Sequence, residues 1–478
     1  MRIHLILFCL LGIGLVAHAQ TGYKIHFKIQ GLHDTTAYLG YYYGESTFVR
    51  DTAKVDSKGE FTFDGKQPLL HGVYMLVLDK AKIFELVVGA NQDFSMETST
   101  ADYIKDMKVK NDPDNKLFFE NMVFNMDRHK EADPYLKVIK DSTLTEDKKK
   151  DARAAFTKIN DKVTAYQEDI ITKYPTTITA KLFKANKAVK IPDPPKKANG
   201  SIDSTFQLKW YREHFFDYFD LSDDALLRLP QPLYNQKVDE YLDKLYVPQR
   251  DSVVKAIDKM VAKAKPNQET FKYLLWHCMI KYQTPEIMGL DEVFVDLYDK
   301  YFATGAMDFW ANEKMKKNLK DYADRVRLSM LGKTAPDLIM KDSHDQLKSL
   351  YNIKNKYTIV FFFSPECGHC RKETPKLVEF YTKDKAKYNL EVFAVSTDTS
   401  MTKMKEFIKE MKMPWVTVNF YYSAVGHYQQ LYDAPSTPTL YVLDDKKKII
   451  GKKVPIEKLG DFLTNYEKYH KPKVASKT

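Results

Sequence analysis

The chain has 478 residues, of which 44% are hydrophobic, 13% aromatic and 29% charged, and its formal net charge is +10. A chain of this length is expected to form about three domains, and this composition excludes an intrinsically disordered protein. The positive charge comes from lysines scattered among acidic residues, as over 147–151, and not from a basic block. We therefore expect no nucleic-acid partner.

The first residues have the pattern of a secretory signal peptide. Met1 and Arg2 precede a nearly continuous apolar run over 3–16, and Ala17-His18-Ala19 supplies the small-x-small cleavage pattern. This predicts a signal peptide at 1–19 and a mature protein in the periplasm. No later stretch is apolar over a length that could span a bilayer, so we expect no membrane span after cleavage.

Residues 20–110 are predicted to form a β domain. Its first run alternates buried-type and polar residues with a period of two, which is typical of a half-buried strand. The apolar members of that run are Tyr23, Ile25, Phe27 and Ile29. Further strand-like runs, separated by glycine and aspartate, cover 37–43, 60–64, 73–78 and 84–88.

Residues 111–328 are predicted to be α-helical, because apolar residues recur there every three or four positions. One such stripe consists of Ala152, Phe156, Ile159, Val163, Tyr166 and Ile170, and a second of Leu208, Tyr211, Phe215 and Phe219. A proline-rich loop at 191–200 separates the two stripes. We expect both stripes to pack into a core.

From 331 to 470 the pattern is that of an α/β domain. Strands are predicted at 358–363, 390–395, 439–443 and 448–452, and helices after the first strand and at 401–411 and 456–469. Strands that alternate with helices predict a partly parallel sheet covered on both faces.

Two of the cysteines carry the chemistry. Outside the predicted signal peptide, only Cys278, Cys367 and Cys370 remain, too few for a disulfide scaffold. Cys367 and Cys370 form a C-x-x-C motif directly after the strand at 358–363, where free backbone N–H groups and the helix dipole can lower a thiol pKa to about 3.5–7.5. This predicts a redox-active pair in which Cys367 attacks and Cys370 resolves, whereas Cys278 is expected to be a buried structural thiol.

The C-terminal region resembles the TlpA/ResA-like thiol–disulfide oxidoreductases of the AhpC/TSA group in the thioredoxin superfamily. The resemblance is carried by Ala335-Pro336-Asp337-Leu338, the C-x-x-C motif, Glu373, Pro375, Ser396-Thr397-Asp398 and Thr437-Pro438. Residues 55–65 resemble the β domain of unknown function that precedes such domains, and residues 214–220 and 226–230 resemble their helical domain of unknown function. The resemblance implies a multidomain chain that ends in a thioredoxin-like fold.

The resemblance also implies roles for individual residues. Pro438 is expected to be a cis-proline facing the cysteines, and Thr437 beside it is expected to bind the substrate chain together with Gly368 and His369. Glu373 is expected to accept or relay protons, the alternative being an ordinary exposed helix glutamate. The Gly368-His369 pair is similar to that of protein disulfide isomerases, whereas the rest of the domain resembles reductants, so both directions stay open.

These features predict a periplasmic enzyme that reduces or isomerises protein disulfides through its dithiol, with a membrane-linked thiol as electron donor. We expect no cofactor and no metal. One departure from the thioredoxin pattern is Glu366, which stands where tryptophan is usual, and its carboxylate would oppose thiolate formation if it pointed inward.

Two alternatives use the same residues. A peroxidase of this fold has the pattern Pro-x-x-x-Thr/Ser-x-x-Cys, in which Ser364 fits but Val360 stands in the proline position. A metal-handling protein would use Cys367, Cys370 and a histidine as ligands.

Overall fold

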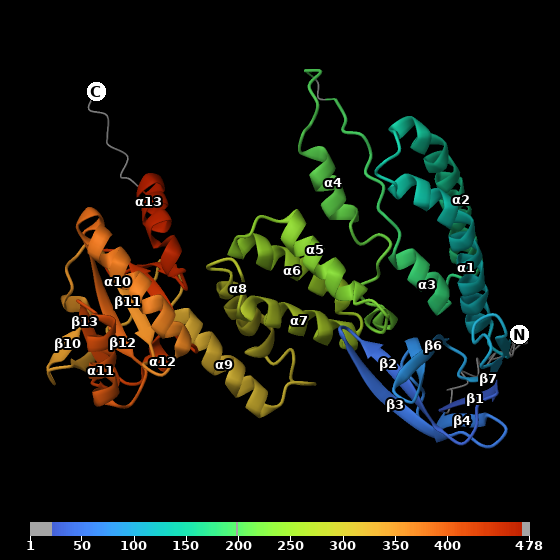
Figure 1. Ribbon diagram of the computed structural model, residues 1–478, viewed down its shortest axis with the longest axis horizontal. Helices are drawn as coiled ribbons and strands as arrows, with labels where there is room; N and C mark the ends of the chain where they lie inside the picture. The colour runs from blue at the N-terminus through green and yellow to red at the C-terminus, as the bar shows by residue number, and fades with distance from the viewer. Residues whose placement is uncertain (1–21, 197–198, 471–478) are drawn as a thin grey trace, which may run out of the picture. The chain divides into compact units, whose positions relative to one another are not determined.

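The computed structural model describes residues 22–196 and 199–470, so the predicted signal peptide at 1–19 lies outside the described residues. The chain divides into two compact units. The first comprises the residues up to Tyr241 with Lys263–Thr270, and the second comprises Leu242–Ala262 with the residues from Phe271 onward. The border falls inside the predicted helical region, and each unit is described by itself (Figure 1).

The β region of the first unit contains two four-stranded sheets, ordered β4-β1-β7-β8 and β3-β2-β5-β6. In β1 every second side chain is buried, as the alternation predicts. Phe27 of β1 lies 6.3 Å from Phe84 of β6 between ring centroids, so the apolar faces of the two sheets meet. The strands are β1 (Tyr23–Gln30), β2 (Thr36–Tyr43), β3 (Ser46–Lys54), β4 (Glu60–Gly65), β5 (Gly72–Leu78), β6 (Ala81–Val88), β7 (Asp93–Ser99) and β8 (Lys108–Lys110).

Polar side chains fix the helices of this unit to its strands. Asp112 caps the first helix, and the Asn115 side chain bonds both the N–H and the C=O of Val87 at 2.8 and 2.7 Å. The Asp114 carboxylate accepts the backbone N–H of Ile178 at 2.6 Å, which satisfies a free donor at the start of the third helix. The elements are α1 (Pro113–Lys140), α2 (Glu146–Lys173), α3 (Ile178–Ala185), α4 (Phe206–His214), η1 (Asp224–Leu227) and α5 (Leu233–Leu245).

The structure confirms the first predicted apolar stripe as a helix with a buried face, but not the second. Ala152, Ile159 and Ile170 are buried on α2, as expected. The prediction that the second stripe lies on one helix was wrong, because α4 ends at His214, before Phe215 and Phe219. Leu208, which was expected in the core, is 44% exposed. Phe215 and the residue after it lie in turns and pack on Tyr241 of α5. Here packing against another element, not helical periodicity, accounts for the spacing of the aromatic residues.

The second unit contains helices followed by a seven-stranded sheet with the order β10-β9-β13-β12-β11-β14-β15. Its helical part is α6 (Arg250–Ala264), α7 (Gln268–Gln283), α8 (Asp291–Leu297), η2 (Tyr298–Phe302) and α9 (Glu313–Leu328). The α/β part is β9 (Ile339–Asp342), β10 (Leu347–Ser349), η3 (Leu350–Asn352), β11 (Tyr357–Phe363), α10 (Gly368–Tyr388), β12 (Leu390–Ser396), α11 (Met401–Met411), β13 (Val416–Ser423), α12 (Tyr428–Leu431), β14 (Thr439–Leu443), β15 (Ile449–Lys452), η4 (Ile456–Lys458) and α13 (Leu459–Tyr469). This arrangement confirms the predicted fold class.

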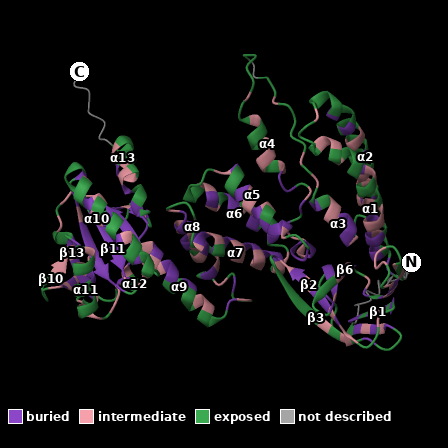
Figure 2. Ribbon diagram, in the orientation of Figure 1, coloured by how far each residue is buried: buried purple, intermediate pink, exposed green. Residues whose placement is uncertain are grey.

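The central strand, β11, is buried along its whole length (Figure 2). It pairs parallel with β12 and antiparallel with β14. Phe361 and Phe363 face the core under α10 and α13, whereas Phe362 faces the opposite core and stacks on Tyr428 at 5.2 Å. Each such burial contributes about 1.5–3 kcal/mol, so the end of β11 is a firm support for the residues that follow it.

Candidate active site

The C-x-x-C motif lies where β11 ends and α10 begins. Cys367 is the N-cap residue of α10, with φ −80° and ψ 116°, and its Sγ accepts the backbone N–H of Cys370 at 3.4 Å. Serine, threonine, aspartate or asparagine oxygen usually fills this role. Here a sulfur occupies the positive end of the helix dipole, a position that stabilises negative charge.

The two thiols have opposite acidities. Burial acts against ionisation of Cys367, but the backbone N–H and the thiol of Cys370 both bond to its sulfur, and together they hold the pKa of Cys367 below the ordinary 9.0. Cys370 is fully buried, and burial raises its pKa to about 12 even though the backbone N–H of Ser364 donates to its sulfur at 3.4 Å. Cys367 therefore ionises first, while Cys370 retains its proton.

The loop before β14 closes over the motif. The Thr437–Pro438 peptide bond is cis, the geometry that the family resemblance implies. The thiol of Cys367 donates to the carbonyl oxygen of Thr437 at 3.3 Å, which joins residues 70 positions apart. A Cβ built on Gly368 meets no atom within 4 Å. The sulfur of Cys367 thus has a backbone acceptor in the cis-proline loop, and the space around the neighbouring Gly368 is open.

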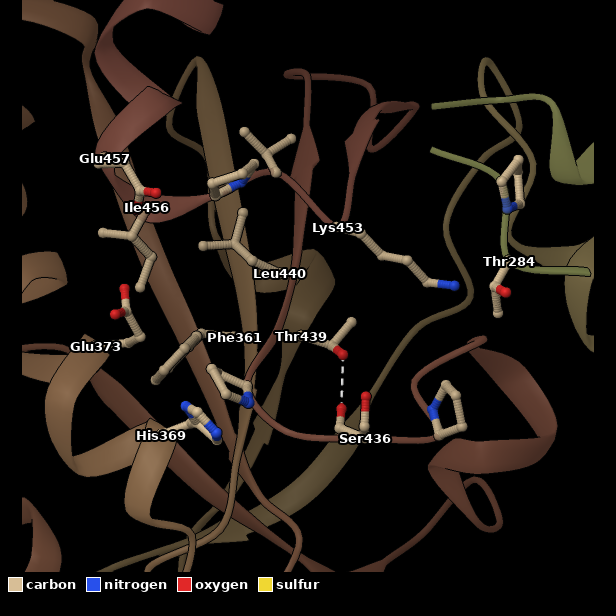
Figure 3. A pocket seen from close by; sticks show the side chains of 15 residues that line it. Thr284, Phe361, His369, Glu373, Ser436, Thr439, Leu440, Lys453, Ile456 and Glu457 are labelled. Atoms are coloured by element: carbon tan, nitrogen blue, oxygen red, sulfur yellow. Dashed lines mark hydrogen bonds between the residues drawn. The ribbon is translucent and has the colours of Figure 1, made fainter. Parts of the chain in front are cut away.

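A groove of about 570 Å³ lies next to the motif. His369 and Glu373 of α10 line one side of it (Figure 3). Pro438 of the cis-proline loop also lines it. The Glu373 carboxylate accepts Lys376 Nζ at 2.5 Å, so its charge is compensated within α10. Of the residues that the sequence singled out, the groove therefore brings His369, Glu373 and Pro438 together, while Thr437 contacts the sulfur of Cys367.

Other residues of the groove were not foreseen. Lys453 and Glu457 follow β15, and Thr284 and Pro285 lie in the loop between α7 and α8. Ser436 also lines the groove, and its place beside Thr437 was the one available signal for it in the sequence. The other four carry no motif, because only tertiary packing brings them to the groove.

Glu366 does not point at the thiol. Its side chain is 64% exposed and forms an ion pair with Lys403 of α11. The carboxylate that departs from the thioredoxin pattern is thus held at the surface with its charge compensated.

The structure also describes the residues on which the peroxidase and metal-handling alternatives depend. Val360, which stands where a peroxidase has proline, is a fully buried member of the β11 ladder. Cys278 is fully buried in α7, as expected of a structural thiol. Within the described part of the chain, no three His, Cys, Asp or Glu side chains lie together in a way that could hold a metal ion.

Comparisons with known proteins divide the chain in the same order. Residues 331–452 match the AhpC/TSA family, and residues 23–118 and 145–324 match two domains of unknown function, DUF4369 and DUF5106. The thiol-disulfide oxidoreductase ResA of Bacillus cereus is 28% identical over 133 residues, which are 27% of this chain and 73% of ResA.

Two further relatives match a similar share of this chain. Nucleoredoxin 1 of Arabidopsis thaliana is 28% identical over 124 residues, 26% of this chain, which spans only 21% of that protein. The crystal structure of a domain of a possible thiol-disulfide isomerase from Cytophaga hutchinsonii is 39% identical, covers 29% of this chain and 95% of that domain, and has a TM-score of 0.28.

The AhpC/TSA match contains the C-x-x-C motif, the cis-proline loop and the strands β9 to β15. These are the residues on which the sequence resemblance rested. Over residues 331–452 the chain thus matches the AhpC/TSA family, and in this domain it is a thioredoxin-like oxidoreductase similar to the TlpA/ResA-like thiol–disulfide oxidoreductases.

Proposed function

We propose that this protein reduces or isomerises protein disulfides in the periplasm through Cys367 and Cys370. The observation that carries the proposal is the opposite displacement of the two thiol pKa values within one C-x-x-C motif. A partly exposed sulfur that ionises easily is a nucleophile, and a buried sulfur that keeps its proton is a resolving thiol held in reserve.

The exchange proceeds in two balanced steps. The Cys367 thiolate attacks one sulfur of a substrate disulfide, the substrate S–S bond breaks, a mixed disulfide forms, and the released substrate thiolate takes a proton from water. Cys370 then loses its proton and attacks the Sγ of Cys367, which releases the second substrate thiol and leaves a Cys367–Cys370 disulfide. Two electrons have passed to the substrate, and a membrane-linked dithiol returns them.

In isomerisation the second step differs. Another thiol of the substrate attacks the mixed disulfide, the Cys367 thiolate is released, and no electrons are transferred overall.

The neighbouring residues support these steps. Thr437 presents its carbonyl oxygen beside Cys367, where it can accept a backbone N–H of the substrate next to Pro438. Glu373 follows Cys370 by three residues on α10, so the two share neighbouring faces of the helix. We assign Glu373 as the acceptor of the Cys370 proton, because a thiol with a pKa of about 12 needs a base in order to react.

The compartment rests on the signal-peptide pattern of residues 1–19. Across residues 22–196 and 199–470, no helix combines the length and the apolar character needed to cross a membrane.

The test is reduction of insulin by dithiothreitol in the presence of the full chain. Cys367→Ser should abolish catalysis, and Cys278→Ala is the matched control because Cys278 is buried in α7 and is not part of the C-x-x-C motif. If disulfide exchange persisted in Cys367→Ser, the assignment of Cys367 as the nucleophile would be wrong. The direction is tested by equilibration with glutathione, where a potential close to about −120 mV would identify an oxidase instead.

A further inference from the structure

One side of the groove beside Cys367 is formed by residues outside the thioredoxin-like domain. Thr284 and Pro285 come from the loop between α7 and α8, whereas the family match begins at residue 331. Figure 3 shows Thr284 on the side of the groove opposite His369 and Glu373, with Lys453 reaching toward it. We call Thr284 and Pro285 the helical wall of the groove.

Buried polar contacts hold this wall in place. Asp291 at the start of α8 forms an ion pair with Lys452 of β15, and their side chains are only 5% and 3% exposed. The backbone N–H of Lys452 also donates to the sulfur of Met288 at 3.1 Å, in the same loop as Thr284. A buried ion pair is costly to break, because either partner alone is an uncompensated charge. The loop is therefore tied to the sheet and lines the groove as a fixed element.

The cis-proline loop is tied to the end of α9, in the same helical segment. Asp433, five residues before Pro438, is buried, and its backbone N–H donates to the hydroxyl of Ser329 after α9 at 3.4 Å. Its carboxylate accepts Lys453 Nζ at 2.8 Å. Both sides of the groove thus share supports in the helical segment.

The floor of the groove is apolar. Leu440, Val454 and Ile456 line it, and two of the charged groups at its edge are already paired within the chain, Lys453 with Asp433 and Glu373 with Lys376. A volume of about 570 Å³ lies in the usual range for small-molecule pockets, so it is large enough for a few side chains. Such a lining favours an apolar side chain over a charged one.

We propose that the helical wall selects the substrate: an extended polypeptide binds along the cis-proline loop and places an apolar side chain, adjacent to its reacting cysteine, against Thr284 and Pro285. This inference rests on the proposed function. It assigns to the helical segment a direct part in substrate recognition. It also predicts that small disulfides, which react at the two cysteines without filling the groove, are insensitive to the wall.

The test uses the full chain and three disulfides. Two are symmetrical disulfides of short peptides that differ only in having leucine or aspartate beside the cysteine, and the third is hydroxyethyl disulfide. Thr284 is exposed, so Thr284→Trp narrows the groove without entering the core. Thr284→Glu, which adds a charge at the same place, is the second variant. Ile287→Trp is the matched control, because Ile287 lies in the same loop, is 47% exposed and does not line the groove.

We expect the wild type to prefer the leucine peptide by about tenfold in kcat/KM, equivalent to ~1.4 kcal/mol. Both Thr284 variants should raise KM for that peptide by about tenfold at unchanged kcat. Their rates with hydroxyethyl disulfide should equal that of the wild type, and Ile287→Trp should behave as the wild type throughout.

The inference is overturned if the Thr284 variants leave KM unaltered, if they slow all three disulfides alike, or if the wild type does not distinguish the two peptides. A wild type that reduces none of the three disulfides contradicts the proposed function itself, so the two failures are distinguishable. Thermal unfolding of each variant at the wild-type temperature verifies that the fold is retained.

Discussion

The difference in acidity between the two cysteines predicts a large difference in their reactivity. Burial moves the pKa of Cys370 from the ordinary 9.0 to about 12, a displacement of three units. Below pH 9 the thiolate fraction of Cys370 is therefore about a thousandfold smaller than that of an ordinary cysteine. The pKa of Cys367 is displaced downward, so the ratio of the two thiolate fractions exceeds a thousandfold.

Alkylation of the reduced protein measures this ratio. Iodoacetamide reacts with the thiolate, and mass spectrometry of quenched samples between pH 6 and pH 10 gives the rate at each cysteine. Cys367 should react with a midpoint below 9.0, and at pH values well below 9 it should react about a thousandfold or more faster than Cys370. In urea the two rates should become similar, because unfolding returns both thiols to water. Similar rates in the folded protein, or a midpoint of Cys367 at or above 9.0, would refute the reasoning.

Three further predictions concern single substitutions. Cys370→Ser should accumulate a mixed disulfide between Cys367 and substrate on non-reducing gels, and its absence would contradict the resolving role. Asp291→Asn leaves Lys452 buried without its counter-charge and should lower the free energy of unfolding, measured in urea, by about 3–5 kcal/mol. A loss under about 1 kcal/mol would show that this ion pair contributes little to stability. Glu373→Gln should slow resolution of the mixed disulfide by up to about a hundredfold without changing alkylation of Cys367, and equal resolution rates would exclude the relay.

Local pattern was enough to predict the elements that carry the chemistry. Seven consecutive residues of β11 are buried, and such an uninterrupted apolar run followed by a helix is visible without any knowledge of the rest of the fold. The strand β3 was missed for the converse reason, because most of its residues are exposed on both faces and no alternation marks it. The end of α4 was missed because Phe215 follows a helical spacing but packs on Tyr241 instead.

In the candidate site, too, some features follow from the local sequence and others depend on tertiary contacts. That Glu366 precedes Cys367 is a fact of sequence, but whether its carboxylate opposes the thiolate depends on Lys403, which lies 37 residues away and draws it to the surface. Pro438 was identified through its resemblance to a family motif and not through any local signal, since 70 residues separate Thr437 from the sulfur that it meets.

By itself, the sequence located the two cysteines through which we propose that disulfides are exchanged. The C-x-x-C motif lies at one strand-to-helix junction. Against the effect of burial, hydrogen bonds from Cys370 in the first turn of that helix lower the pKa of Cys367, and the contact with Thr437, 70 residues away, contributes less. Only the tertiary structure decided which residues line the groove next to this motif. Thr284 and Pro285 line the groove because a buried ion pair joins Asp291 to Lys452, 161 positions apart in the chain. The sequence does not indicate which of its many charged residues will be buried together as a pair.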